Sequence, residues 1–327
     1  CRWILLVSGW LARIPGHAVY LNNPFLKYWL LYTYALFAAA CLFRGTPRRR
    51  YALAGALACL TLVLTVRLGA ARYRSDLDIL MLDVGQGQSV ALASGGHFAL
   101  VDCGSANSWL DPSAAALKQL RTMGCGALEA LILTHSDSDH VSGVPKLLAQ
   151  MEVKRLLLSG KGDWAEIRGA ARKYGVQVEV LTEKQEMELG QSRLTVFPPV
   201  TSGEDNDSGL SVLAAVGEKE FLLTGDMSAA AEKRLLETWD LPDIEGCAAG
   251  HHGSKYSSSD EFLTALRPET VCISVGSNSY GHPAEGTLAR LEEHGCGVFR
   301  TDREGIIHLS WNREGAYGDK SEAAEEE

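Results

Sequence analysis

The run Thr-His-Ser-Asp-Ser-Asp-His-Val-Ser-Gly at Thr134–Gly143 places two imidazoles and two carboxylates within six positions. It follows the apolar run Ala130–Leu133, which predicts a buried strand. Gly143 and Pro145 come at the start of a segment whose pattern predicts a helix. A rigid strand that ends in a His/Asp cluster is a common support for metal ligands. The sequence therefore predicts a metal site at the end of this strand.

The same run allows two other interpretations. Ser and Asp favour turns, so a polar loop without any ligand is the first alternative. A calcium-binding loop is the second, and it requires Gly at its sixth position and an acid at its twelfth. Counted from Asp137, these positions hold Ser142 and Leu148, which excludes the calcium loop.

Three further segments end in Asp or contain His. Phe221–Asp226 is an apolar strand pattern that ends on a carboxylate, and Gly250–Ser254 holds a His pair between glycines. Asp102 closes the apolar run that precedes the first cluster. Each segment alone is typical of a strand end or a turn. Their order along the chain, Asp, His-x-Asp-x-Asp-His, Asp, His, favours one shared metal site.

With these motifs the chain resembles the metallo-β-lactamase superfamily, and more narrowly the C-terminal domain of the ComEC family of DNA-uptake channel proteins. The resemblance covers residues 78–310. It rests on the segments Leu82–Gln88, Val101–Gly104, Thr134–Gly143, Leu222–Asp226, His251–Lys255 and Tyr280–Pro283. It implies an α/β fold, the metallo-β-lactamase αββα sandwich, preceded by transmembrane helices.

The resemblance also implies the ligands of two divalent ions. The first ion would be held by His135 and Asp137, the second by Asp139, His140 and His251, and Asp226 would bridge them. Such a pair stabilises the charge that develops on a phosphate and lowers the pKa of water. Carboxylate-rich ligand sets suit harder ions better than an all-imidazole zinc site does. The expected cofactors are therefore two divalent ions, manganese first and zinc second.

The chain departs from the superfamily pattern at three positions. Asp137 stands where a second His is usual, and Gln88 stands where many relatives carry an acid. The His expected before Asp226 is absent, and its place falls near Asp205–Ser208. These departures concern the identity and occupancy of the metals more than the fold.

Other polar residues are expected around the ions, although each is also a common turn residue. An imidazole between Gly281 and Pro283 can protonate a leaving oxygen near neutral pH. Ligand imidazoles need acceptors behind them, and substrate phosphates need donors. The expected catalytic residues are Asp139 and His282, the expected supporting residues Asp83, Asp102 and Asn206, and the expected substrate-binding residues Ser254, Lys255 and Asn278.

The charge distribution divides the chain near residue 75. The net charge is −9, yet residues 1–75 hold ten Lys or Arg and none of the 40 acidic residues. This asymmetry predicts two environments: a membrane segment over residues 1–75 and a metallo-β-lactamase-like domain over residues 76–313. An acidic tail over residues 314–327 is expected to be disordered.

Two apolar runs, Phe25–Phe43 and Tyr51–Val66, predict transmembrane helices. At ~1.5 Å per residue each is just long enough to cross a ~30 Å hydrocarbon core. A buried hairpin of a soluble domain is the alternative. Four arginines in Arg44–Arg50 place that loop in the cytoplasm and the C-terminal domain outside it. Neither run fits a secretory signal. Because the sequence starts at Cys1, in the segment Cys1–Ile14, and not at a Met, we expect a fragment that lacks upstream channel helices.

The pattern of the domain predicts strands and helices that suit two sheets packed face to face with helices outside. Asp78–Ala93 is predicted as one strand, and Trp164–Tyr174 as a helix that ends at Gly175. The cysteines of this part, which are Cys103, Cys125, Cys247, Cys272 and Cys296, include no C-x-x-C and predict buried thiols rather than disulfides.

The expected function is a membrane-anchored, metal-dependent nuclease that cleaves single-stranded DNA during uptake, in transient contact with DNA and beside other uptake proteins. The acidic domain opposes this function, because DNA binding usually depends on basic patches. Two alternatives stay open: a small-molecule ester or lactam hydrolase of the same fold, and a non-catalytic domain of a DNA channel.

Overall fold

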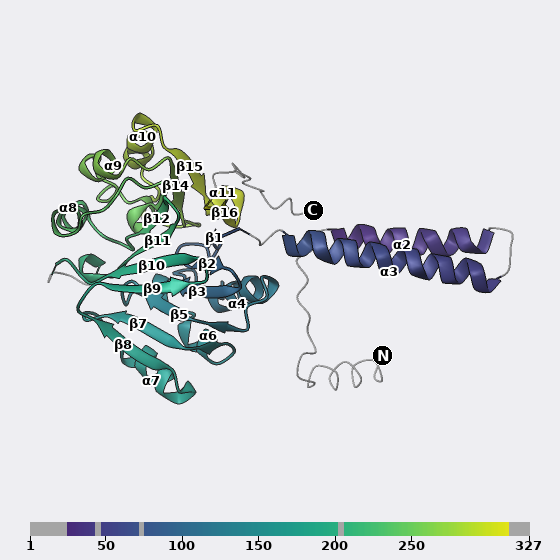
Figure 1. Cartoon of the computed structure of the whole chain (residues 1–327). Coiled ribbons are helices and arrows are strands. Elements are labelled where there is room, and N and C mark those ends of the chain that lie inside the picture. Colours follow the sequence, from purple (N-terminus) through teal and green to yellow (C-terminus); the bar gives the residue numbers. More distant parts are fainter. Residues whose placement is uncertain (1–24, 43–46, 72–74, 202–205, 314–327) are drawn as a thin grey trace. The chain divides into compact units, whose positions relative to one another are not determined.

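The computed structural model describes residues 25–42, 47–71, 75–201 and 206–313 (Figure 1). The chain divides into two compact units, and the N-terminal boundary falls between Arg74 and Ser75. Several expectations lie outside the described residues: those for Cys1–Ile14, for the first part of the arginine loop at residues 44–46, for Asp205 and for the tail over residues 314–327.

The first unit is a hairpin of helices α2 (Phe25–Leu42) and α3 (Pro47–Ala71) (Figure 1). Small buried side chains, Ala40 on one helix and Ala54 and Ala58 on the other, let the two backbones approach. The Trp29 Nε1 donates a hydrogen bond to the Ala58 carbonyl oxygen at 3.1 Å, which ties the helices together. The two apolar runs of the sequence are therefore helical.

The outward faces of this hairpin are largely apolar. Its exposed large side chains include Leu31, Tyr34, Leu53 and Leu60. Judged by length and hydropathy together, none of the described helices qualifies as a membrane span.

The second unit contains two seven-stranded sheets and one short pair of strands, β4 (Ala127–Leu128) with β6 (Glu152–Val153). In spatial order the first sheet holds β16 (Ile307–Trp311), β1 (Leu77–Met81), β2 (Val90–Ser94), β3 (His97–Val101), β5 (Ala130–Leu133), β7 (Arg155–Ser159) and β8 (Gln177–Leu181). The second holds β15 (Gly297–Arg300), β14 (Thr270–Ile273), β13 (Gly246–Ala248), β12 (Lys219–Leu223), β11 (Ser211–Val216), β10 (Ser192–Phe197) and β9 (Gln185–Leu189).

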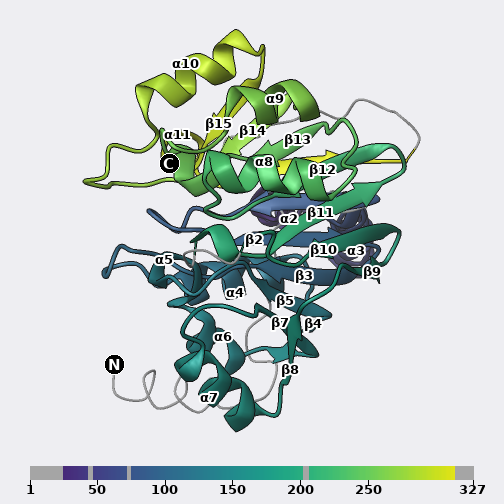
Figure 2. The ribbon, with the colours of Figure 1, turned by 90° about the vertical axis from the view of Figure 1, so that its left-hand side faces the viewer.

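The two sheets face each other across one apolar core (Figure 2). Alternate residues of each strand point into it, as the two-residue period of a strand requires. Ile79, Val101 and Ile132 enter from the first sheet, and Val212 and Phe221 enter from the second.

Helices cover the outer faces, so the layers follow the expected αββα order. A second apolar cluster joins the second sheet to α8 (Ala229–Thr238), α9 (Asp260–Leu266) and α10 (Glu285–Glu293). The outer side of the first sheet carries α4 (Pro112–Thr122), α6 (Val144–Leu148) and α7 (Ala165–Tyr174) (Figure 2). Short helices complete the unit: α5 (Ser138–Val141), α11 (Thr301–Glu304), η1 (Asn206–Ser208) and η2 (Gly250–Gly253).

Parallel pairing brings the carboxyl ends of several strands to one edge, because parallel strands end on the same side of a sheet. In the first sheet β3 and β5 are parallel, with Val101 opposite Ile132. In the second sheet β12, β13 and β14 are parallel, with Leu222 opposite Cys247. The segments that follow these strands hold Asp and His.

The predicted strand Asp78–Ala93 is wrong in its middle. The structure has two antiparallel strands there, β1 and β2, joined by a loop over residues 82–89. The Leu82 N–H donates to the Ser89 carbonyl oxygen at 2.9 Å and closes this loop. The polar side chains between them, Gln86 and Gln88, are buried and lie beside the metal-ligand candidates described below.

The cysteines are placed as predicted. Among the described residues, the five cysteines of the second unit are buried free thiols. Burial raises the pKa of Cys103 well above its usual value, and it raises the pKa of Cys272 to about 12. These thiols therefore stay protonated and behave as small apolar side chains.

Candidate metal centre

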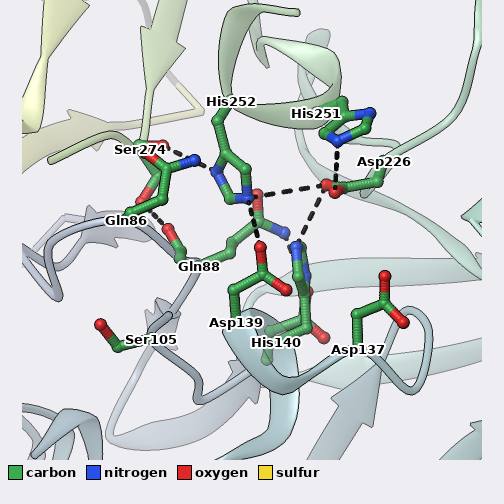
Figure 3. A network of polar contacts seen from close by, with 12 residues as sticks. Gln86, Gln88, Ser105, Asp137, Asp139, His140, Asp226, His251, His252 and Ser274 are labelled. Atoms are coloured by element: carbon green, nitrogen blue, oxygen red, sulfur yellow. Dashed lines mark hydrogen bonds and ion pairs between the residues drawn. The ribbon is translucent and has the colours of Figure 1, made fainter. Parts of the chain in front are cut away.

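The Asp226 carboxylate lies at the centre of a cluster of imidazoles and carboxylates (Figure 3). Its Oδ1 is 3.1 Å from the Nε2 of His140 and 3.9 Å from the Nε2 of His252. Its Oδ2 is 3.4 Å from the Nε2 of His251 and 3.8 Å from the Nε2 of His135. The two oxygens of one buried carboxylate thus face two different sets of nitrogens.

Asp226 occupies this position because the turn after β12 packs closely against the end of β5. Gly225 has a φ of +60°, and a Cβ on it would lie 2.9 Å from the Cβ of Thr134. Only glycine meets both demands, since it tolerates positive φ and adds no side chain. The Gly225 carbonyl oxygen accepts a hydrogen bond from the His251 N–H at 3.1 Å, which brings the His pair to the same place.

Four residues form a compact group of potential ligands. Asp139, His140, Asp226 and His252 each present one ligand atom, and these atoms lie within 4.8 Å of one another. The Nε2 of His252 is 3.5 Å from the Oδ2 of Asp139. Two imidazole nitrogens and two carboxylate oxygens are a donor set that divalent transition metals accept.

The second His of the pair, His252, belongs to this group, whereas the sequence led us to expect His251. Both residues have left-handed backbone conformations, with φ of +50° for His251 and +53° for His252. The resulting sharp turn points the two rings in different directions. The His252 ring is buried, and its Nδ1 is 2.8 Å from the Ser274 carbonyl oxygen. That contact requires a proton on Nδ1 and leaves Nε2 free to bind a metal.

His251 contacts Asp226 from the other side, and its side chain is 35% exposed. Its Nε2 faces the Asp226 oxygen that His135 also faces. Asp137, whose Oδ2 is 3.8 Å from the Nε2 of His135, lies on this side too, with its side chain 48% exposed. His251 therefore groups with His135 and Asp137, which the sequence assigned to the other ion.

Asp102 holds His140 from behind the group. The His140 Nδ1 donates to the Asp102 Oδ2 at 2.8 Å, so the Nε2 of that ring faces Asp226. Asp102 is fully buried, and it also accepts hydrogen bonds from the Gln88 side chain and from the N–H and hydroxyl of Thr134. A carboxylate that orients a ligand imidazole is a frequent partner of a metal site. Gln88 thus acts as a donor to Asp102.

The backbone of this region is packed too tightly for larger residues. A Cβ on Gly104 would lie 2.4 Å from backbone atoms of Asp139 and His140. The Cys103 N–H donates to the His140 carbonyl oxygen, and the Gln88 N–H donates to that of Asp139. Two loops far apart in sequence, which carry Gln88 and Cys103–Gly104, therefore fix the loop that carries the His/Asp run.

The donor set fits a metal by a further observation. Within the described residues, four buried atoms at the centre have no hydrogen-bond partner: the Nε2 atoms of His135, His140 and His252, and the Oδ1 of Asp226. A buried polar atom without a partner costs free energy of about 1–3 kcal/mol. Four such atoms that converge on one place are the arrangement that a bound cation would satisfy.

The charges of the cluster are set by the mutual proximity of its members. Burial lowers the pKa of His135 to about 4, and the neighbouring His140 acts in the same direction. Burial also disfavours the charged forms of His140 and Asp226. Their mutual attraction outweighs it, so the pKa of His140 is raised well above its usual value and that of Asp226 is held well below. Asp226 is thus an anion at neutral pH, as a metal ligand must be.

A cleft with a volume of about 300 Å³ opens over the group. Its lining includes Asp137, Asp139, His251, His252 and His282. The His282 ring lies 5.3 Å from the His251 ring. Burial lowers the pKa of His282, and the proximity of the His251 and His252 imidazoles acts in the same direction.

Three of the predicted residues form hydrogen bonds with backbone groups of their own loops. Asp83 accepts a hydrogen bond from the Gly85 N–H at 3.2 Å and caps a turn. Asn278 accepts from the N–H groups of Tyr280 and His282 and donates to two carbonyl oxygens, so its amide shapes the loop that carries His282. Ser254 is buried, and its hydroxyl accepts from the Tyr256 N–H.

The remaining predicted residues lie near the edge of the site. Lys255 is exposed, with its Nζ 4.8 Å from the centre of the Tyr256 ring. Asn206 and Asp207 line a second cleft beside Asp226. Asp207 accepts from the N–H and hydroxyl of Ser228. Its carboxylate therefore supports the start of α8.

Replacement of Asp102 by alanine is expected to lower the affinity for manganese about 10- to 100-fold, because His140 loses the partner that orients it. Isothermal titration with manganese measures this change. Asp83→Ala is the matched control, since it removes a strand-end aspartate that contacts only a turn, and it should bind as the unmodified chain does. An unchanged affinity in a folded Asp102→Ala variant would contradict this role.

The family model described as "Metallo-beta-lactamase superfamily" matches residues 82–276. In the solved structure of the metallo-beta-lactamase fold protein YhfI from Bacillus subtilis, the similar region covers 72% of this chain and 100% of that one. Its TM-score is 0.50 and its sequence identity is 12%. This likeness concerns the fold, and it agrees with the two-sheet sandwich described above.

Two relatives are similar to this chain in sequence over most of its length. ComE operon protein 3 of Bacillus subtilis (strain 168) is 26% identical over 345 residues, which cover 96% of this chain and 44% of the relative. Competence protein ComA of Neisseria gonorrhoeae is 28% identical over 256 residues, which cover 74% of this chain and 33% of the relative. The chain thus spans less than half the length of these proteins. The resemblance to the ComEC family is confirmed.

Proposed function

Because the chain belongs to the metallo-β-lactamase superfamily, we propose that it is a metal-dependent phosphodiesterase that cleaves single-stranded DNA during DNA uptake. The observation that carries this proposal is the position of Asp226, whose two oxygens face two separate sets of ligand atoms. A carboxylate between two ions is the arrangement that phosphoryl-transfer sites with paired metals use.

The two sets of ligands follow from the distances. The Oδ1 side of Asp226 would hold one ion with Asp139, His140 and His252, and the Oδ2 side would hold the other with His135, Asp137 and His251. When bound, such ions supply positive charge to phosphoryl oxygens and lower the pKa of water. The balance of imidazoles and carboxylates favours manganese, with zinc as the second choice.

The side chains of the cleft would orient the substrate and move a proton. His282 lies in the cleft on a loop that Asn278 fixes with four hydrogen bonds. This loop holds the imidazole near His251, where it can transfer a proton to the leaving oxygen. Asp139 would act as a metal ligand that positions the reacting groups. Lys255 would contact a phosphate at the edge of the site.

We propose that the helical hairpin attaches this domain to the cell membrane, with the domain on the extracytoplasmic side. The exposed apolar side chains of α2 and α3 support attachment, and the arginine loop supports the orientation. The printed names of the relatives, which include a competence protein, support DNA as the substrate and other uptake proteins as partners.

Manganese is expected to raise the melting temperature of the second unit by about 5–10 °C when it is present at a hundredfold excess over its dissociation constant. Ligation that occurs only in the folded state adds about 2.7 kcal/mol under that condition, and a domain of this size gains about 2–4 °C per kcal/mol. A thermal scan of the whole chain in detergent, with manganese and with chelator, measures the shift. Identical melting curves would contradict a resident metal.

The acidic lining of the cleft favours one alternative, a small-molecule ester or lactam hydrolase of the same fold. The carboxylates of Asp137, Asp139 and Asp226 all face the space where a polyanion would lie. Assays of labelled single-stranded DNA and of small esters with the same manganese-loaded protein separate the two functions. Turnover of esters without DNA cleavage would select the alternative.

A further inference from the structure

Two clefts meet at the centre of the site. The first, of about 300 Å³, includes Tyr280 and His282 in its lining, and the second, of about 480 Å³, includes Asn206, Ser228 and Tyr256. Asp226 and His251 line both. The candidate metal centre is therefore open to two adjoining spaces rather than to one closed pocket.

Each cleft contains one tyrosine whose side chain is exposed. Tyr280 is 69% exposed in the first cleft, and Tyr256 is 65% exposed in the second. An exposed aromatic ring beside a functional group offers a flat face on which a nucleobase can stack. Each of the two clefts beside the candidate metal centre therefore has one exposed tyrosine ring in its lining.

The backbone under each ring is fixed. The Tyr280 N–H donates to the Asn278 side chain at 3.0 Å, in the same network that holds His282. The Tyr256 N–H donates to the Ser254 hydroxyl, and its carbonyl oxygen accepts from the Ala229 N–H at 2.7 Å. Both rings thus project from ordered loops, which lowers the entropy lost when a ligand stacks on them.

The charges of the clefts show what kind of contact can hold a nucleic acid there. Among the described residues that line the two clefts, four are carboxylates and none is Lys or Arg: the carboxylates are Asp137, Asp139, Asp207 and Asp226. The described lining therefore offers no Lys or Arg side chain that could form an ion pair with a phosphate. Stacking of bases on aromatic rings needs no positive charge and works for any base sequence.

Resting on the function proposed above, we propose that Tyr256 and Tyr280 are stacking platforms for nucleobases on the two sides of the phosphate that is cleaved. The substrate class would then be single-stranded nucleic acid, because the bases of a duplex are already stacked on each other and cannot reach the rings. The Lys255 Nζ lies over one face of the Tyr256 ring, 4.8 Å from its centre. The base would therefore stack on the opposite face, and Lys255 would contact the nucleic-acid backbone next to it.

The test compares Tyr256→Ala and Tyr280→Ala with the unmodified whole chain in detergent. Binding of a fluorescein-labelled oligothymidylate with cleavage-resistant phosphorothioate linkages is followed by anisotropy at saturating manganese, so that the sites stay filled and cleavage does not interfere. Each alanine variant should bind about 5- to 150-fold more weakly, whereas Tyr256→Phe and Tyr280→Phe should stay close to the unmodified protein. Tyr174→Ala is the matched control, because this tyrosine is 40% exposed on α7 and lines neither cleft.

An abasic oligonucleotide of the same length and charge separates stacking from a general loss of structure. The unmodified chain should bind it more weakly than either alanine variant binds oligothymidylate, because both stacks are lost rather than one. The alanine variants should bind the abasic oligonucleotide as the unmodified chain does. Alanine variants that bind oligothymidylate normally would overturn the proposal, and so would variants that lose affinity equally for both oligonucleotides. Manganese-dependent hydrolysis of methyl p-nitrophenyl phosphate by the unmodified chain reports the proposed function separately.

Discussion

Asp226→Asn should abolish metal-dependent cleavage of single-stranded DNA, with a decrease in kcat of about 10³-fold or more. The asparagine keeps the shape of the side chain but removes the charge that faces both sets of ligands. Charge stabilisation by paired ions lowers a barrier by several kcal/mol, and each 1.36 kcal/mol is a factor of ten. Initial rates on a labelled oligonucleotide, at saturating manganese, measure the loss.

The control for this variant is Asp243→Asn. Asp243 is exposed and pairs with Arg267 on the surface of the second unit, and an exposed ion pair contributes little. Its variant should cleave within about twofold of the unmodified rate. If Asp226→Asn is folded and cleaves as the control does, the bridging role of Asp226 is wrong.

The two histidines of the pair should differ in their effects. His252→Ala removes one ligand of the four-residue group and also its hydrogen bond to the Ser274 carbonyl oxygen. We expect a loss of manganese affinity at this group beyond the roughly 100-fold upper end for supporting residues. His251→Ala leaves the group intact, so it should retain one tightly bound ion and lose the second.

Metal stoichiometry after gel filtration, measured by inductively coupled plasma mass spectrometry, distinguishes the two variants. In the expectation from the sequence, His251 completes the group with Asp139 and His140, and His252 is not a ligand. Two ions retained in His252→Ala, with one ion lost in His251→Ala, would support that expectation and contradict the geometry. The comparison is matched, since both variants remove an imidazole from the same turn.

The sequence predicted the segments of the site because each follows a strand. Apolar runs that end at Asp102, His135 and Asp226 predict strand ends, and parallel pairing brings such ends together. It did not predict which imidazole of the pair faces the centre. That choice depends on two successive left-handed residues, His251 and His252, and no periodicity in the sequence reports such a turn.

The other differences also arise from tertiary contacts. Asp83 and Asn278 were expected at the site as polar groups, but neighbouring N–H groups engage their side chains. Residues 82–89 were predicted to lie within one strand, yet they form a loop whose two ends pair with each other and whose glutamines lie beside the site. Strand β9 alternates Gln, Glu and Met at the edge of its sheet and has too few apolar residues to be recognised.

The acidic composition of the domain is an argument against a nuclease. In the structure, part of this acidity is concentrated at the candidate metal centre. Carboxylates gather where the candidate ligands lie, and bound divalent ions would reverse the sign of the charge there. DNA would then meet positive charge only at the centre of the cleft. Contacts elsewhere would depend on aromatic side chains and on Lys255.

The most direct test of the proposed metal-dependent phosphodiesterase is the rate of single-stranded DNA cleavage by the whole chain as manganese is titrated into the metal-free protein. We predict no cleavage in chelator and a rate that rises with manganese and saturates as the sites fill. Equal cleavage in chelator, or no cleavage when manganese is bound stoichiometrically, would contradict it.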